Sequence, residues 1–102
     1  MKKIINGKMY NTETAREISY WSNNHFTSDF NYCEETLYRK KTGEFFILGE
    51  GGGMSKYAKM YDTNSWGWGE EIIPMSAGEA KKWLEQKGGA EEYISVFGEP
   101  EE

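Results

Sequence analysis

The stretch Tyr32–Tyr57, YCEETLYRKKTGEFFILGEGGGMSKY, decides the fold of this chain. Its side chains alternate in character up to Arg39, which predicts a strand with one core face and one solvent face. A turn at residues 40–43 follows, because Lys-Lys-Thr-Gly ends in a glycine suited to a left-handed backbone. Residues 44–48 hold the densest apolar run of the chain and predict a return strand, buried on both faces, at the centre of a sheet.

A glycine loop continues this stretch and opens onto an expected short helix from Ser55 to about Tyr61. Backbone amides, a helix N-terminus and a lysine then form a candidate anion site, made of Gly51, Gly52, Gly53, Ser55 and Lys56. The spacing does not match a Walker A motif, and the carboxylate of Glu50 would repel an anion. A tight strand-to-helix turn is the preferred interpretation, with phosphate or nucleotide binding as the alternative.

The segments before the central stretch predict a hairpin and a helix. Asn6-Gly7 between short apolar arms is typical of a type I′ turn. Ala15, Ile18 and Trp21 fall at helical spacing behind capping residues, so they predict a helix over residues 11–21. A polar loop is expected from there to about Asn31.

The segments after the central stretch predict a loop, a strand and two helices. Residues 62–69 are expected to form a loop that holds Trp66 and Trp68, and residues 70–75 a third main strand stopped by Pro74. Ser76 followed by Glu79 predicts a capped helix that ends at the Gly-Gly pair of residues 88–89. A last helix is expected over residues 90–97, and residues 98–102 are expected to be a frayed acidic tail.

These elements predict a single α+β domain over residues 1–102. We expect a small antiparallel sheet, built from the N-terminal hairpin plus three main strands, with helices packed on one face. A chain of 102 residues is long enough for one modest core, and a 16% aromatic content supplies much of the buried area.

Cysteine and histidine counts limit the chemistry of this chain. Cys33 is the only cysteine and His25 the only histidine, which excludes an internal disulfide, a cysteine-based zinc site and a histidine cluster. We expect no metal and no cofactor. Cys33 and His25 are also the only nucleophile and base that could form a catalytic pair, and Cys33 is expected to be a small buried hydrophobe instead. No catalytic residue is predicted, and the protein is not expected to be an enzyme.

Targeting signals and long apolar runs are missing from the sequence. The basic start has no following apolar region of a signal peptide, and no run approaches the ~20 residues that span a bilayer. The sequence therefore predicts a cytoplasmic protein that does not enter a membrane.

Charge divides the chain into two unequal halves. Residues 1–59 carry nine Lys/Arg against seven Asp/Glu, whereas residues 60–102 carry three Lys against ten Asp/Glu. The acidic half suits a basic protein partner, although solubility is the commoner reason for acidic residues in a small protein, and no direct binding to nucleic acid is expected. The candidate partner-binding residues are Trp66, Trp68, Glu70, Glu71, Glu91 and Glu92. Tryptophans that fold inward and anchor the loop are the preferred interpretation for Trp66 and Trp68, with exposed anchors for a partner as the alternative.

The residues also carry a resemblance that extends over nearly the whole chain. The resemblance begins with the opening Lys3-x-Ile5-Asn6-Gly7-Lys8-x-Tyr10-x-Thr12-x-Thr14-Ala15-x-x-Ile18. It continues through Glu34-Glu35-Thr36-Leu37-Tyr38, Thr42-Gly43-Glu44-Phe45-Phe46, Gly49-Glu50-Gly51-Gly52 with Ser55-Lys56-Tyr57-Ala58, and Ile72-Ile73-Pro74 before a helix that contains Ala80 and Trp83. In these segments the chain resembles a group of small proteins from Gram-positive bacteria, their plasmids and their phages. Some proteins of this kind are anti-CRISPR proteins, which inhibit the Cas9-type nuclease.

This resemblance implies a function but no catalytic residues. It implies an inhibitor that binds a Cas9-like effector, or its guide complex, through an acidic surface and blocks nucleic-acid binding or cleavage. Two alternatives remain open: an interaction module of a mobile element that binds another host protein, and the phosphate or nucleotide binder that would use the glycine loop.

Overall fold

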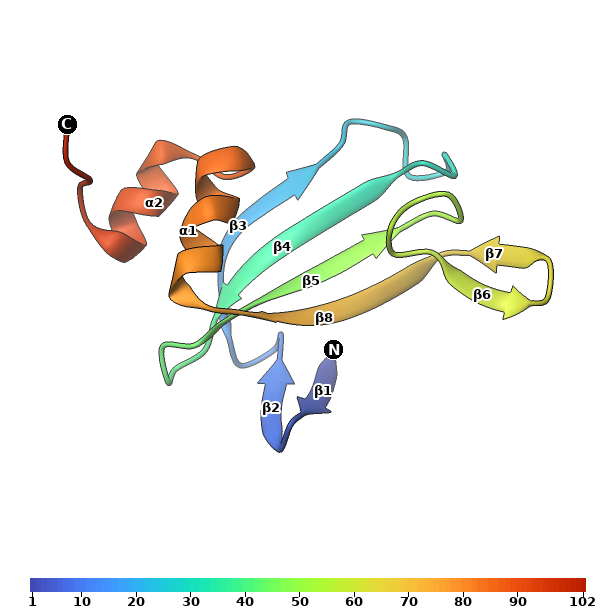
Figure 1. The fold of residues 1–102 in the computed structure, drawn as a ribbon, viewed down its shortest axis with the longest axis horizontal. Coiled ribbons are helices and arrows are strands. Elements are labelled where there is room, and N and C mark those ends of the chain that lie inside the picture. Colours follow the sequence, from blue (N-terminus) through green and yellow to red (C-terminus); the bar gives the residue numbers. More distant parts are fainter.

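A computed structural model describes residues 1–102 as eight strands and two helices (Figure 1). The elements in chain order are β1 (Lys2–Ile5), β2 (Lys8–Asn11), β3 (Arg16–Ser22), β4 (Cys33–Arg39), β5 (Phe45–Gly51), β6 (Lys59–Asp62), β7 (Ser65–Gly67), β8 (Gly69–Met75), α1 (Ala77–Gln86) and α2 (Ala90–Phe97). Strands β3, β4, β5 and β8 form one antiparallel sheet in the order β3-β4-β5-β8. Two further ribbons, β1-β2 and β6-β7, extend from it. The predicted α+β fold is confirmed, with four strands in the main sheet where the sequence predicts three.

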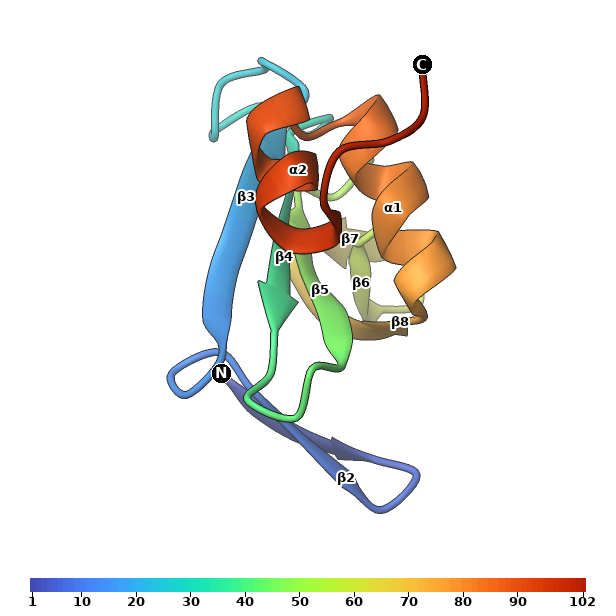
Figure 2. The ribbon, with the colours of Figure 1, turned by 90° about the vertical axis from the view of Figure 1, so that its left-hand side faces the viewer.

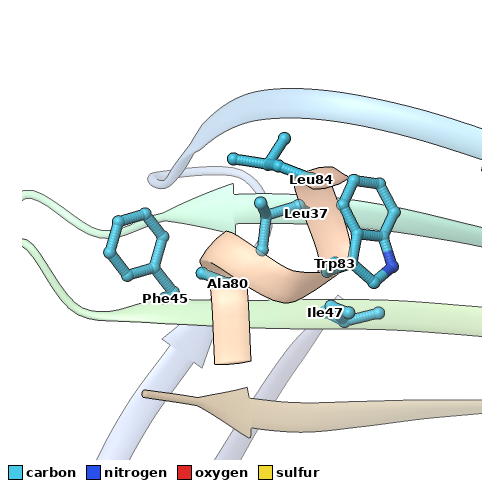
Figure 3. Packing of buried hydrophobic residues seen from close by; sticks show 6 residues of the cluster. All are labelled: Leu37, Phe45, Ile47, Ala80, Trp83 and Leu84. Atoms are coloured by element: carbon cyan, nitrogen blue, oxygen red, sulfur yellow. The ribbon is translucent and has the colours of Figure 1, made fainter. Parts of the chain in front are cut away.

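Both helices lie against one face of the main sheet (Figure 2). Ala80, Trp83 and Leu84 of α1 face the sheet, where they meet Leu37, Phe45 and Ile47 (Figure 3). Complete burial of a large apolar side chain stabilises the fold by about 1.5–3 kcal/mol, so this cluster anchors a helix that would be marginal alone. Tyr93, Val96 and Phe97 of α2 pack against the same cluster.

The opposite face of the sheet has a smaller cluster. Because successive side chains of a strand point to opposite faces, Phe46 points away from its neighbours Phe45 and Ile47. Phe46 packs there against Tyr10 of the N-terminal hairpin and Ile72 of β8. The centre of β5 is thus buried on both faces, as its continuous apolar run predicts.

The helix predicted over residues 11–21 is wrong, because this segment contains β3. A β-bulge between Glu17 and Ser19 inserts one residue into the β3–β4 ladder. Ile18 and Trp21 consequently pack against the same core cluster although three positions separate them. That spacing is also the spacing of one face of a helix, so the apolar pattern alone favours the wrong element.

The helix predicted from Ser55 to Tyr61 is also wrong. The Ser55 hydroxyl accepts a hydrogen bond from the Tyr57 amide (3.2 Å) and donates one to the Gly52 carbonyl (2.7 Å), which closes a turn. The chain then enters β6, which pairs with β7. The predicted loop over residues 62–69 is therefore partly strand, with Trp66 opposite Met60 in a two-stranded ribbon.

The remaining sequence predictions hold, with one correction. Asn6 and Gly7 have positive φ angles of 51° and 77° in the β1-β2 turn. Ser76 and Glu79 form the predicted capping box of α1. Pro74 does not stop β8: it lies opposite Phe46, and an edge strand tolerates a missing amide on its outer side. Residues 98–102 lie outside helices and strands and are exposed. Neither helix is long and apolar enough to cross a membrane.

Candidate partner-binding surface

The end of the sheet that carries the β6-β7 ribbon exposes large apolar side chains. Trp66 is 57% exposed and Trp68 is 38% exposed. The preferred interpretation of an inward-folded tryptophan pair is therefore wrong. The ribbon projects beyond the main sheet (Figure 1), and all four residues of β6 are exposed, so no apolar layer covers it.

Local contacts hold this exposed end in a defined shape. The indole of Trp68 stacks on the ring of Tyr32, with centroids 5.7 Å apart and planes at 15°. Tyr61 donates its hydroxyl hydrogen to the Trp68 carbonyl. The Met54 amide donates to the Phe30 carbonyl at 2.8 Å, which joins the glycine loop to the loop after β3. We call the exposed group the aromatic end: Phe30, Met54, Tyr61, Trp66 and Trp68.

A row of three carboxylates leads to the aromatic end. Glu34 of β4, Glu50 of β5 and Glu70 of β8 lie directly opposite one another across three neighbouring strands. Neighbouring strands are about 4.8 Å apart, so the three carboxylates crowd one another. We call Glu34, Glu50 and Glu70 the carboxylate row. It lies on the sheet face away from the helices, because Glu35, next to Glu34, points toward α1.

Hydrogen bonds and neighbouring like charges shift the pKa values of Glu50 and Glu34. The hydrogen bond with Glu34, then burial, then the neighbouring Glu70 raise the pKa of Glu50 to about 8. Burial acts to raise the pKa of Glu34, but hydrogen bonds from Glu50, Tyr32 and Tyr20 outweigh it and hold that pKa below its usual value. At neutral pH Glu50 is therefore protonated and shares its proton with an ionised Glu34.

No cation neutralises the row from within the molecule. The ion pairs of the chain involve Glu35, Glu44 and Asp29, and none involves Glu34, Glu50 or Glu70. The hydroxyls of Tyr20 and Tyr32 donate to Glu34 instead. No group of three or more His, Cys, Asp or Glu has the arrangement of a metal site. The row therefore offers uncompensated negative charge to a partner.

The structure divides the six candidate partner-binding residues. Trp66, Trp68 and Glu70 lie together at the aromatic end and the carboxylate row. Glu71 follows Glu70 on β8 and so points to the helix face. Glu91 and Glu92 begin α2, at the other end of the molecule (Figure 1). Sequence reasoning did not find Glu34 and Glu50; the strand register that aligns them was the missing information.

The glycine loop is packed against other backbone and does not open toward solvent as an anion site. A Cβ at Gly51 would overlap Ser55, one at Gly52 would overlap the Phe30 carbonyl, and one at Gly53 would overlap the Trp66 carbonyl. The Gly52 amide already donates to Tyr32 at 2.9 Å. Lys56 is engaged as well, with its ammonium 2.7 Å from Glu35. No helix follows to supply an N-terminus, so the glycines serve close packing.

Glu35 is a buried charge that sequence reasoning missed. Its side chain is 2% exposed and accepts hydrogen bonds from four donors: Tyr57, Trp83, Lys56 and Lys87. Burial would raise the pKa of Glu35, but these four bonds lower it to about 2. The two lysines come from the glycine loop and from the end of α1. This network connects α1 to the sheet. In the sequence, only the strand alternation, which puts Glu34 and Glu35 on opposite faces, could have indicated that one of them is buried.

Cys33 and His25 do not form a catalytic pair. Cys33 is buried in β4, and burial raises the pKa of its thiol. His25 lies in the loop after β3, with its Nδ1 3.4 Å from Asp29.

The fold and this surface define a small α+β protein with an acidic, aromatic end. No protein-family model matches the chain, and no curated protein or solved structure matches it either.

Proposed function

We propose that this protein binds a basic surface of a nucleic-acid-binding protein through the carboxylate row and the aromatic end. One observation carries the proposal: two exposed tryptophans lie beside three in-register carboxylates that have no cation of their own. This surface leaves tryptophans exposed and negative charge without a cation, and neither feature stabilises the folded protein. Its benefit comes from a partner.

The charge of the surface favours a partner that normally holds phosphates. Proteins that grip nucleic acid do so with arrays of Lys and Arg. A row of carboxylates can occupy those cations and exclude the nucleic acid, and its field raises the rate of association. Exposed charges are screened beyond about 8 Å at physiological salt, so this binding weakens as salt rises.

The tryptophans supply the apolar part of the contact. Trp is enriched among the few interface residues that carry most of the binding energy, at the centre of a patch with a polar rim. Trp66 projects from a ribbon that nothing covers, and Trp68 is held in place by its stack on Tyr32. A pre-positioned side chain loses less conformational entropy when a partner covers it.

The partner we propose is a Cas9-type nuclease or its guide complex, in the cytoplasm of a bacterial host. The sequence resemblance to small anti-CRISPR proteins supports this choice, and the acidic surface is compatible with it. The protein would act as an inhibitor of nucleic-acid binding or cleavage, without catalysis of its own. A different basic host protein is the alternative, and the same surface would bind it.

The test mixes the purified protein with guide-loaded Cas9 orthologues and measures co-elution on a sizing column together with cleavage of target DNA. We expect co-elution and protection of the DNA with at least one orthologue. If the protein neither co-elutes nor protects with any orthologue, the Cas9 assignment is wrong. Capture of another basic protein from host lysate, lost in the W66A/W68A variant, would then favour the alternative partner.

Adjacent residues of β8 provide a matched control for the binding face. Glu70 and Glu71 are both exposed, but Glu70 belongs to the carboxylate row and Glu71 points to the helix face. Glu70→Gln should weaken binding by about 3-fold to 10-fold, the effect of one charge contact of about 1 kcal/mol. Glu71→Gln makes the same chemical change and should leave the affinity within about 2-fold. Equal effects of the two changes would mean that another face binds.

A further inference from the structure

A hollow of about 680 Å³ lies at the other end of the main sheet, between the start of β3 and the turn that joins β4 to β5. Its lining is polar apart from one alanine, and it consists of Thr14, Ala15, Arg16, Arg39, Lys40, Lys41, Thr42 and Gly43. Half of these residues are cationic. We call this hollow the basic cleft.

Two arginines of the basic cleft lie directly opposite each other across the β3–β4 ladder. Arg16 pairs with Arg39 in the register of the strands. Like charges in this position destabilise a sheet. Neither guanidinium has a carboxylate within 4 Å, and Arg39 lies instead over the ring of Phe45, 5.2 Å from its centroid. The fold therefore places two arginines that have no carboxylate partner on the lining of one cleft.

Other charged groups near the cleft do not cancel this pair. Glu44 already contacts Lys8 at 2.9 Å and Lys40 at 3.5 Å. Glu17, Glu91 and Glu92 line an adjoining hollow with Arg16, but none forms an ion pair with it. The N-terminal hairpin, the start of β3 and the turn after β4 (residues 1–17 and 39–44) carry seven Lys/Arg against three Glu, and α2 adds Glu91 and Glu92 at the same end. Glu34 of the carboxylate row lies five residues along β4 from Arg39, about 17 Å at the rise of a strand, which exceeds the ~8 Å screening length at physiological salt.

We propose that the basic cleft binds a phosphate group, held by Arg16 and Arg39. Two arginines on one cleft carry two positive charges, and a phosphate supplies about two negative charges on one centre with several oxygens for the planar Arg forks. A single carboxylate supplies one charge. The hydroxyls of Thr14 and Thr42 also line the cleft, but they donate to the Asn11 carbonyl and to Glu44.

The lining of the cleft offers charged contacts to a phosphate and no stacking contact to a base attached to it. None of its lining residues is aromatic, so it has no platform on which a base could stack. A small polyphosphate and the backbone of a nucleic acid share this chemistry. This site is separate from the proposed partner-binding surface. Binding of a nucleic-acid backbone there would contradict the sequence-based expectation that the protein does not contact nucleic acid directly.

The experiment titrates the protein with inorganic pyrophosphate by calorimetry and with a labelled single-stranded oligonucleotide by fluorescence anisotropy, both at low salt. We expect binding of at least one probe, weaker at higher salt because Lys and Arg contacts to phosphate release counterions. Arg16→Gln together with Arg39→Gln should weaken it by about 10-fold or more. Binding of pyrophosphate alone indicates a small polyphosphate ligand, and binding of the oligonucleotide alone indicates a nucleic-acid backbone.

Two control variants distinguish binding at the cleft from a general effect of the protein's net charge. Lys81→Gln with Lys82→Gln removes the same charge from the exposed side of α1, and should leave binding within about 2-fold. Glu91→Gln with Glu92→Gln removes nearby negative charge and should strengthen binding. Urea unfolding of each variant checks that it is folded. No binding of either probe by the wild-type protein, or equal losses in R16Q/R39Q and K81Q/K82Q, would overturn the proposal.

Discussion

At the scale of single residues, Glu34 and Glu35 are neighbours with opposite environments. Glu35 points into the helix layer, where Lys56 and Lys87 neutralise it and hold its pKa at about 2. Glu34 points to the open face, where its neighbours are Tyr20, Tyr32 and the protonated Glu50. The alternation of a strand thus separates a charge that holds the fold together from a charge that is offered outward.

Replacement of Glu35 by Gln should destabilise the protein by about 2 kcal/mol, because removal of a buried charge leaves its bonded partners uncompensated. Lys56 is largely exposed and can return to water, which keeps the loss below the full cost of a buried unpaired charge. Urea unfolding measures the change. The control Glu71→Gln on the surface of β8 should lie within about 0.5 kcal/mol of wild type. If Glu35→Gln changes the free energy of unfolding as little as Glu71→Gln does, the Glu35 network does not hold α1 on the sheet.

The raised pKa of Glu50 predicts a stability that falls with pH. Between the unfolded value of about 4.3 and the folded value of about 8, the folded protein binds a proton that the unfolded chain has released. The free energy of unfolding should therefore decrease as the pH rises through this window. Glu34 stays ionised across it and adds no slope. Glu35, whose pKa is lowered, contributes to the free energy of unfolding across this window, and the contribution is lost only below about pH 4.5.

The variant Glu50→Gln tests this dependence, because glutamine imitates the protonated acid and does not titrate. Urea midpoints between about pH 5 and pH 8 should fall for the wild-type protein and change less for the variant. Parallel curves for the two proteins would show that Glu50 does not carry the shared proton.

At the scale of elements, local signals predicted some segments and tertiary pairing decided the others. The turn at Asn6-Gly7 and the capping box of Ser76 and Glu79 depend on neighbouring residues alone, and the structure confirms both. The segment that forms β3 has the apolar spacing of a helix, because a bulge places Ile18 and Trp21 on one core cluster. Ser55 makes a cap-like bond that closes a turn and starts no helix. Neither the strand β3 nor the turn at Ser55 can be predicted without knowledge of the strands that pair with these segments.

Two Gly→Ala substitutions should have opposite effects on stability. A Cβ at Gly49 in β5 would overlap the ring of Tyr57, which also bonds Glu35, so Gly49→Ala should cost about 2 kcal/mol through overpacking. Gly78 in the first turn of α1 has no atom closer than 3.9 Å to an added Cβ, and Gly78→Ala should stabilise by about 0.5 kcal/mol. Urea unfolding compares them. A neutral Gly49→Ala would mean that Tyr57 can move without loss.

At the scale of the whole molecule, the carboxylate row and the basic cleft lie at opposite ends of the main sheet. The basic end is not uniformly positive, because Glu91 and Glu92 of α2 adjoin Arg16 there. Sequence reasoning could assign acidity to the second half of the chain, and it included Trp66, Trp68 and Glu70. It could not select Glu34 and Glu50 or separate Glu91 and Glu92, because these assignments depend on strand register and on where α2 docks.

The most direct test of the proposed function is a titration of DNA protection against a guide-loaded Cas9 orthologue. The account predicts that the wild-type protein protects the target. W66A/W68A should need at least about 10-fold more protein for equal protection, and urea unfolding checks that it is folded, because Trp68 stacks on the buried Tyr32. E91Q/E92Q, at the other end of the molecule, should protect like wild type. Full protection by W66A/W68A, or a loss confined to E91Q/E92Q, would contradict the account.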